Sequence, residues 1–200
     1  MSSFFVSVAL FLGLGTSSIF GHAGPLVNLM VEKNAQCGVA NIIELDRDYI
    51  LSKVETYYTA EIRTVTSDIS DRSAGGINDF YSEGDYWWPV DGDYNAPYVR
   101  RDGESNPKNF IAHRLSMMRL ADIMAGLVAG YLLTDDEVLS KKYANRAEAH
   151  LLAWFVDSET SMNPNLLYAQ AIKGRYTGRS IGLIDTLHLV EVALAANILI

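Results

Sequence analysis

Apolar and polar positions alternate with helical spacing in four segments of the chain. An apolar residue at every third or fourth position places those side chains on one face of a helix. The pattern predicts a helix within residues 46–62, one after residue 107, one after residue 134 and one starting near residue 180. Their apolar stripes are Ile50, Val54, Tyr58 and Ile62; Met117, Leu120, Met124, Leu127 and Tyr131; Leu139, Tyr143, Ala147, Leu151 and Phe155; and Leu183, Leu187, Val190, Leu194 and Ile198.

Capping signals predict where two of these helices begin. Asn106 followed by Pro107 is a good N-cap with proline at the first helical position. Thr134 and Glu137 have the spacing of a capping box, in which each side chain satisfies the other's backbone N–H.

Two long segments, residues 64–109 and 158–177, lack periodicity; the first is rich in glycine, proline and aspartate, and the second is broken by Asn163-Pro164 and Gly174. Such residues form turns, and a long irregular loop in a compact domain is often functional. No convincing strand pattern is present. The sequence therefore predicts an all-α fold of helical hairpins joined by functional loops.

The N-terminus resembles a signal peptide. An apolar run from Phe4 to Leu14 is too short to span a membrane, and Gly21-His22-Ala23 offers a cleavage site of small residues. We expect a signal peptide at residues 1–23, a mature domain at residues 24–200 without a membrane span, and secretion to the extracellular space, or to the periplasm in a bacterium. A buried first helix is the alternative interpretation.

Charge excludes one class of function and leaves another open. The net charge of −8 and the pI near 4.9 argue against a general nucleic-acid binder, which carries a basic face. A cleft can still be locally basic on an acidic protein, so an anionic sugar substrate stays possible.

Metal-binding and nucleophile motifs are absent from the sequence. There is no His-Glu-x-x-His, cysteine pair or Gly-x-Ser-x-Gly. His113, His150 and His188 stand singly on predicted helices, where a lone histidine is usually a packing or surface residue. We therefore predict no metal site and no nucleophilic catalysis.

The first irregular segment combines adjacent tryptophans with adjacent arginines. Trp87 and Trp88 could stack on pyranose rings, and Arg100 and Arg101 could bind a carboxylate in a bidentate fork. In the alternative interpretation, the aromatic residues close the open end of the helix assembly. The arginines would then pair with neighbouring carboxylates, namely Asp85, Asp102 and Glu104.

The second irregular segment concentrates amide, phenol and cationic groups ahead of a helix. Asn165, Tyr168 and Gln170 supply the amide and phenol groups. A locally basic patch follows at Lys173, Arg175 and Arg179, and Gly178 with the helix start near Ser180 could supply backbone donors to an anion. A capping loop with a solvated charge cluster is the alternative.

Several ordered motifs together resemble the alginate lyase domain family. They are Trp87-Trp88-Pro89, residues 98–107, Trp154-Phe155, residues 162–165 and residues 178–185. The resemblance implies an incomplete (α/α) toroid that cleaves a uronate polysaccharide by β-elimination without a metal or organic cofactor. It implies substrate-binding roles for Trp87, Trp88, Arg100, Arg101, Asn165, Tyr168, Gln170 and Arg179.

The resemblance also implies a catalytic Asn-His pair, followed by an arginine and a tyrosine. No Asn-His dipeptide occurs in the 200 residues. The last apolar helical pattern runs into Ile200, so we expect a truncated domain whose catalytic residues lie beyond it. Tyr168 and Tyr176 are weaker candidates for the base.

Two other functions stay open at this stage. A glycoside hydrolase on a similar helical toroid would need two facing carboxylates, for which Asp85, Asp102 and Asp185 are candidates. A binding protein that holds an acidic polysaccharide without cleaving it, or an inactive fragment, is the other possibility.

Overall fold

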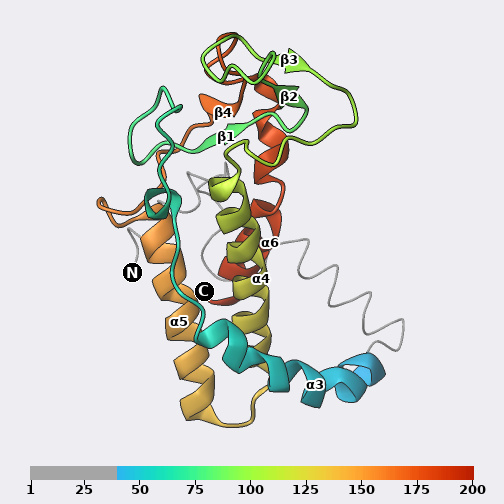
Figure 1. The fold of residues 1–200 in the computed structure, drawn as a ribbon. Helices are drawn as coiled ribbons and strands as arrows, with labels where there is room; N and C mark the ends of the chain where they lie inside the picture. Colours follow the sequence, from blue (N-terminus) through green and yellow to red (C-terminus); the bar gives the residue numbers. More distant parts are fainter. Residues whose placement is uncertain (1–39) are drawn as a thin grey trace. The chain divides into compact units, whose positions relative to one another are not determined.

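The computed structural model describes residues 40–200, with side chains from Arg47 onward (Figure 1). The expected signal peptide lies outside the described residues. The described chain forms two compact units. Unit 1 comprises residues 40–62, Leu120–Leu152 and Leu189–Ile200, and unit 2 comprises Arg63–Arg119 and Ala153–His188.

Unit 1 is helical. It contains α3 (Ala40–Tyr58), α6 (Leu189–Ile198) and most of α4 (Ala112–Leu133) and α5 (Glu137–Phe155). Helices α4 and α5 form a hairpin with a three-residue connection, as the sequence predicts. The stripes predicted for α4 and α5 are largely buried, and the core includes Val54, Leu120, Met124, Leu127, Tyr143, Ala147, Leu151 and Val192.

Two glycines on α4 let its neighbours approach closely. A Cβ on Gly126 would lie 2.1 Å from the Tyr57 ring, and one on Gly130 would lie 2.6 Å from Val54. The end of α3 is then tied to α5, because the Arg146 guanidinium donates to the carbonyl oxygens of Tyr58 and Ala60. These contacts fix how α3 packs within unit 1.

Both predicted helix starts are wrong. Asp136, not Thr134, caps α5, because its carboxylate accepts from the backbone N–H groups of Val138 and Leu139. Helix α4 begins at Ala112, five residues after the predicted start at Pro107. The Asn106 side chain instead accepts from the Lys108 N–H and stabilises a turn.

Unit 2 contains short strands, which corrects the all-α prediction. Strand β1 (Tyr81–Glu83) pairs in parallel with β4 (Tyr168–Ala171), and β2 (Trp87–Trp88) pairs antiparallel with β3 (Val99–Arg100). Unit 2 also contains two 3₁₀-helices, η1 (Val65–Ser67) and η2 (Ser180–Thr186), and the start of α4 and the end of α5. The strands were missed because each has only two to four residues, too few to show a period of two. The protein is nevertheless helix-rich.

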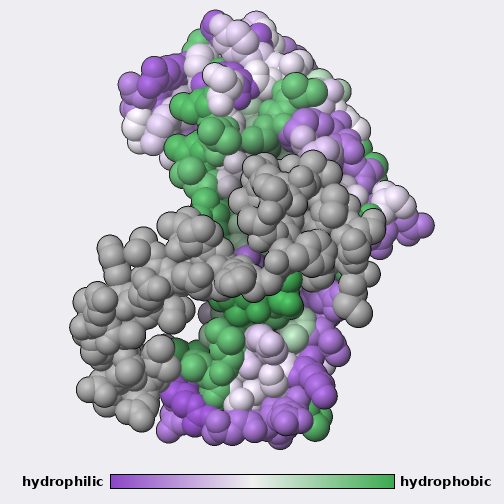
Figure 2. All heavy atoms as spheres, turned by 180° about the vertical axis from the view of Figure 1, so that it is seen from behind, coloured by the Kyte–Doolittle hydropathy of each residue, from purple (hydrophilic) through white to green (hydrophobic). Residues whose placement is uncertain are grey.

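The last predicted helix is also different in the structure. It is divided into η2 and α6, and three residues of its expected buried face are exposed: Leu183, Leu187 and Val190. The buried residues of α6 are Val192, Ala195 and Ala196. Figure 2 shows one face of the described protein, on which apolar surface lies beside strongly hydrophilic patches.

Helix α4 is long and apolar enough to cross a membrane by length and composition. Half of its apolar window is buried within the protein, as in the core helix of many proteins.

Candidate functional site

The pairing of β1 with β4 brings the two irregular segments of the sequence together in unit 2. Tyr81 faces Tyr168 and Glu83 faces Ala171, so β4 has one extra residue between the paired positions. Gln170 lies in this bulge with a φ of 55°, in the left-handed region that is unfavourable for a residue with a Cβ. The bulge turns the Gln170 side chain and its backbone in directions that a regular strand would not allow.

Gln170 joins a buried polar network with Ser82 and Asp185. The Ser82 hydroxyl donates to the Asp185 carboxylate and accepts from the Gln170 backbone N–H at 2.8 Å. The Gln170 amide Nε2 donates to both Asp185 oxygens, at 2.9 and 3.2 Å. Because all three residues are at least nine-tenths buried, these bonds hold β1, β4 and η2 in one arrangement.

The β2–β3 pair separates the two tryptophans. Trp87 lies opposite Arg100 and Trp88 lies opposite Val99. Directly opposed residues share a face of a sheet, and successive residues point to opposite faces. Trp87 and Arg100 therefore lie on one face, and Trp88 lies on the other.

Three arginines gather around Trp87. The Arg175 guanidinium lies 5.6 Å from the centroid of the Trp87 ring. A Cβ on Gly84 would lie 2.6 Å from Nη2 of Arg179 and 2.9 Å from Cδ1 of Trp87, so only glycine lets both side chains approach this point. Arg100 lies opposite Trp87 and close enough to Arg179 to lower its pKa. We call these four residues, Trp87, Arg100, Arg175 and Arg179, the Trp87 cluster.

The Trp87 cluster is electrostatically suited to an anion. Burial lowers the pKa of Arg179, and the charge of Arg100 lowers it further. An arginine nevertheless keeps its proton in proteins. An anionic ligand would relieve the repulsion between these guanidinium groups, and each could offer it a charge-assisted hydrogen bond.

Trp88 and Arg101 form a separate pair on the other face. The Arg101 guanidinium lies 5.1 Å from the Trp88 ring centroid, and the Trp88 indole N–H donates to the Glu104 carbonyl oxygen at 2.8 Å. Arg101 also pairs with the Glu104 carboxylate at 3.9 Å, and Arg100 pairs with Asp102 at 2.8 Å. Both arginine pairings match the alternative interpretation of the sequence, although all of these charged groups are exposed.

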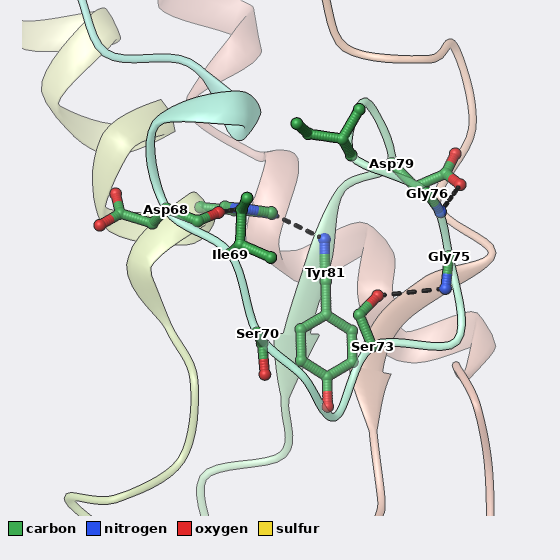
Figure 3. Close-up of a pocket in the computed structure, with 10 residues that line it drawn as sticks. Asp68, Ile69, Ser70, Ser73, Gly75, Gly76, Asp79 and Tyr81 are labelled. Carbon is green, nitrogen blue, oxygen red and sulfur yellow. Dashed lines mark hydrogen bonds between the residues drawn. The ribbon is translucent and has the colours of Figure 1, made fainter.

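Asn165 and Tyr168 lie at a third place in unit 2. The Asn165 amide is 3.4 Å from Asp79, and the Tyr168 ring packs against Gly75. Asp79 and Gly75 line a pocket of about 110 Å³, in which Asp79 and Ser73 are turned toward the backbone N–H groups of Gly76 and Gly75 (Figure 3). The eight residues predicted to bind substrate are therefore distributed over three places rather than one.

Gln170 is buried, which changes its predicted role. Both atoms of its side-chain amide are bonded within the protein, to Asp185 and to Arg179. It supports the Trp87 cluster from behind instead of presenting its amide to a ligand.

Two partly buried ion pairs next to the site were not found from the sequence. The Arg72 guanidinium donates two hydrogen bonds to the Glu83 carboxylate, at 2.6 and 2.8 Å. The Arg114 guanidinium likewise donates two to the Asp85 carboxylate, at 2.8 and 3.1 Å. Burial alone would raise the pKa of Glu83, but hydrogen bonds from Arg72, the Phe110 N–H and Tyr81 outweigh it and lower this pKa. Glu83 and Asp85 flank Gly84, so these pairs fix the backbone on which Trp87 and Arg179 converge. Sequence spacing gave no signal for partners 11 and 29 residues apart.

The carboxylates considered for hydrolysis are all engaged. Asp85 is bound by Arg114, Asp102 by Arg100, and Asp185 is 2% exposed within its network. Asp85 and Asp185 also share one guanidinium, since Arg114 lies 3.7 Å from Asp185. This arrangement does not provide the acid and base of a glycosidase, which need access to opposite sides of one sugar bond.

Among the described residues, no group of three or more histidine, cysteine, aspartate or glutamate side chains could hold a metal ion. What the site offers is a cationic surface with one tryptophan ring, positioned by buried hydrogen bonds.

Comparison with known proteins gives two similarities. The sequence model of the Alginate lyase family matches residues 64–199. A crystal structure of an alginate lyase from Bacteroides ovatus is similar with a TM-score of 0.65 and 29% sequence identity, and the match covers 76% of this chain and 40% of that chain. This chain thus matches less than half the length of that lyase. No curated protein matches the chain.

Proposed function

Because the chain belongs to the Alginate lyase family, we propose that it is part of a secreted polysaccharide lyase that binds a uronate polymer. The observation that supports the substrate class is the Trp87 cluster, where three guanidinium groups meet one indole ring on a chain with a net charge of −8. A uronate residue carries both groups that this cluster suits, a carboxylate and a pyranose face.

The proposed chemistry is β-elimination. The proton at C5 of a uronate lies next to its carboxylate, and it can be removed only when the charge of that carboxylate is neutralised. Cationic and amide donors can do this in the manner of an oxyanion site. A base then takes the C5 proton, the bond from C4 to the leaving oxygen breaks, and that oxygen receives a proton. The products are one fragment with a new reducing end and one fragment whose new non-reducing end carries a C4–C5 double bond.

Within this proposal, the described residues bind and orient the polymer. Arg100, Arg175 and Arg179 would pair with uronate carboxylates, and the ring of Trp87 would contact a sugar. Trp88 and Arg101 would stabilise the neighbouring loop, because they contact each other and Glu104. The incomplete (α/α) toroid is part of the same proposal, and the α4–α5 hairpin is its supporting element.

The test is a calorimetric titration of the full chain with an alginate oligosaccharide. We expect Arg100→Gln and Trp87→Ala each to weaken binding about three- to tenfold, as expected for the loss of one charged hydrogen bond or one stacked ring. The matched control Lys141→Gln, which removes an exposed charge in unit 1, should bind normally.

The reaction is read separately, by the ultraviolet absorbance of the unsaturated product. Binding together with this product supports the lyase. Binding without a product supports the binding-only function, and a cleaved product without a double bond supports a hydrolase. Absence of binding, or equal losses in the cluster variants and their control, would contradict the proposed substrate class.

A further inference from the structure

Gln170 provides both of the acceptors that hold the Arg179 guanidinium. Nε of Arg179 donates to the Gln170 backbone oxygen at 2.6 Å, and Nη2 donates to the Gln170 side-chain oxygen at 3.2 Å. These two bonds fix one edge of the guanidinium plane. Within the described part of the chain, Nη1 of Arg179 donates no hydrogen bond, so the opposite edge is available to a ligand.

The Gln170 amide can take only one orientation. A carboxylate accepts hydrogen bonds and a guanidinium only donates them. The Asp185 carboxylate therefore requires the Nε2 end of the amide, and Arg179 requires the oxygen end. If the amide rotated by 180°, it would place two donors against Arg179 and an oxygen against Asp185.

Asp185 itself is held on several sides. It is 2% exposed, accepts from the Ser82 hydroxyl, and lies 3.7 Å from the Arg114 guanidinium. Arg114 is in turn paired with Asp85. A charged group fixed in this way sets the polarity of the whole chain of bonds from Asp185 through Gln170 to Arg179.

The Trp87 cluster needs such a restraint. Arg100 and Arg179 carry like charges close enough to perturb one another, so an unrestrained Arg179 side chain would turn away from Arg100. Loss of the bond to the Gln170 side chain would leave Arg179 free to do so.

We propose that Asp185 is a positioning residue, which acts through the Gln170 amide to hold the Arg179 guanidinium in the Trp87 cluster without touching the substrate. The proposal deepens the proposed function and rests on it for the identity of the ligand. The geometry of the chain Asp185–Gln170–Arg179 does not depend on that identity.

The first experiment measures the affinity of the full chain for an alginate oligosaccharide. Asp185→Asn removes the charge that orients the amide, and we expect about tenfold weaker binding, the effect of one charge-assisted hydrogen bond. Thr64→Ala is the matched control. It removes the side-chain cap of η1 in the same unit, which lowers stability but leaves the Arg179 contacts in place.

The second experiment uses no ligand. In ¹H–¹⁵N spectra, the Nε–H signal of Arg179 is identified by its loss in Arg179→Lys. We expect it to exchange slowly with solvent in the wild-type chain, more than about tenfold faster in Asp185→Asn, and unchanged in Thr64→Ala. A purely structural role for Asp185 would lower the melting temperature without this selective change.

The outcomes separate the two proposals. If the wild-type chain binds no oligosaccharide, the proposed function fails and the Nε–H exchange still decides the positioning role. If Asp185→Asn does not fold, Gln170→Met breaks the same connection while it keeps the backbone acceptor, and it should show the same faster exchange. The inference would be overturned if the Arg179 Nε–H exchanged at the wild-type rate in every folded variant among Asp185→Asn and Gln170→Met. The same acceleration in Thr64→Ala would also overturn it.

Discussion

Both ring nitrogens of His113 are bound to backbone groups, which makes this residue sensitive to pH. Nδ1 accepts from the Tyr81 N–H at 3.0 Å, and Nε2 lies 2.8 Å from the Asp68 carbonyl oxygen, to which it must donate. The ring is therefore neutral with its proton on Nε2. Protonation of Nδ1 would set two N–H groups against each other at the first residue of β1.

We predict that the chain loses stability in mild acid because of His113. Burial lowers the pKa of His113 below its ordinary value of 6.5. The unfolded state therefore binds its proton first, so the stabilisation is complete above about pH 6.5 and decreases as the pH falls toward the folded-state pKa. Thermal unfolding between about pH 7 and pH 4.5 should show this decrease.

The control for this prediction is His113→Gln, in which an amide can replace both hydrogen bonds but does not titrate. We expect its melting temperature to depend less on pH over the same range than that of the wild-type chain. Identical pH profiles of the two proteins would show that other groups cause the acid sensitivity.

The roles of single residues in the site could be predicted from the sequence only in part. Trp87, Arg100 and Arg179 were predicted as binding residues from their chemistry, and the structure brings them together. Gln170 was predicted beside them as a direct contact, and it is buried. The difference arises from the φ of 55° at Gln170 and from the bond to Asp185, neither of which a local pattern reveals.

At the scale of elements, the packing of α3 on α4 depends on Gly126. We predict that Gly126→Ala destabilises the chain by about 1–3 kcal/mol, because the added Cβ would lie 2.1 Å from the Tyr57 ring. The higher helix propensity of alanine would offset at most about 1 kcal/mol of this loss in stability. Chemical denaturation measures the net free energy of unfolding.

A second substitution tests the cause of that loss. Tyr57→Ala removes the ring that obstructs the new methyl group, so Gly126→Ala in the Tyr57→Ala background should be neutral or stabilising. Equal losses in both backgrounds would mean that the close contact with Tyr57 is not the reason.

Elements with many apolar positions were predicted better than their ends. Most of the predicted stripe residues of α4 and α5 are buried, because several residues in each support the same period. Helix starts depend on one or two capping side chains: Thr134 and Asp136 compete before α5, and Asn106 stabilises a turn instead of capping α4. The division between η2 and α6 was missed because an apolar pattern of this length does not distinguish a 3₁₀-helix from an α-helix.

For the whole molecule, family membership and the helix-rich fold could be predicted, whereas the placement of the site could not. The ordered motifs indicated the family, and its sequence model matches residues 64–199. The strands β1 and β4 join segments about 90 residues apart, and only this long-range pairing shows which polar residues meet. The site therefore follows from the fold rather than from any one motif.

The last prediction concerns how salt changes the affinity for a uronate polymer. It follows from the charge of the whole molecule and rests on the proposed function. The Trp87 cluster attracts a uronate polymer at short range, while the net charge of −8 repels it at long range. At about 0.15 M salt the Debye length is about 8 Å, so the long-range repulsion is screened and the cluster dominates. At about 0.01 M the screening length grows to about 30 Å, and the whole negative charge acts on the polymer.

We therefore expect the affinity for an alginate oligosaccharide to fall as salt rises above about 0.15 M, but to gain little as salt is lowered toward about 0.01 M. The double variant Asp122→Asn, Glu148→Gln removes two exposed negative charges of unit 1, and it should bind more tightly than the wild-type chain only at low salt. Calorimetric titrations across this range measure both effects. A straight dependence of log affinity on log salt in the wild-type chain, unchanged in the double variant, would show that the net charge has no influence and that the cluster alone governs binding.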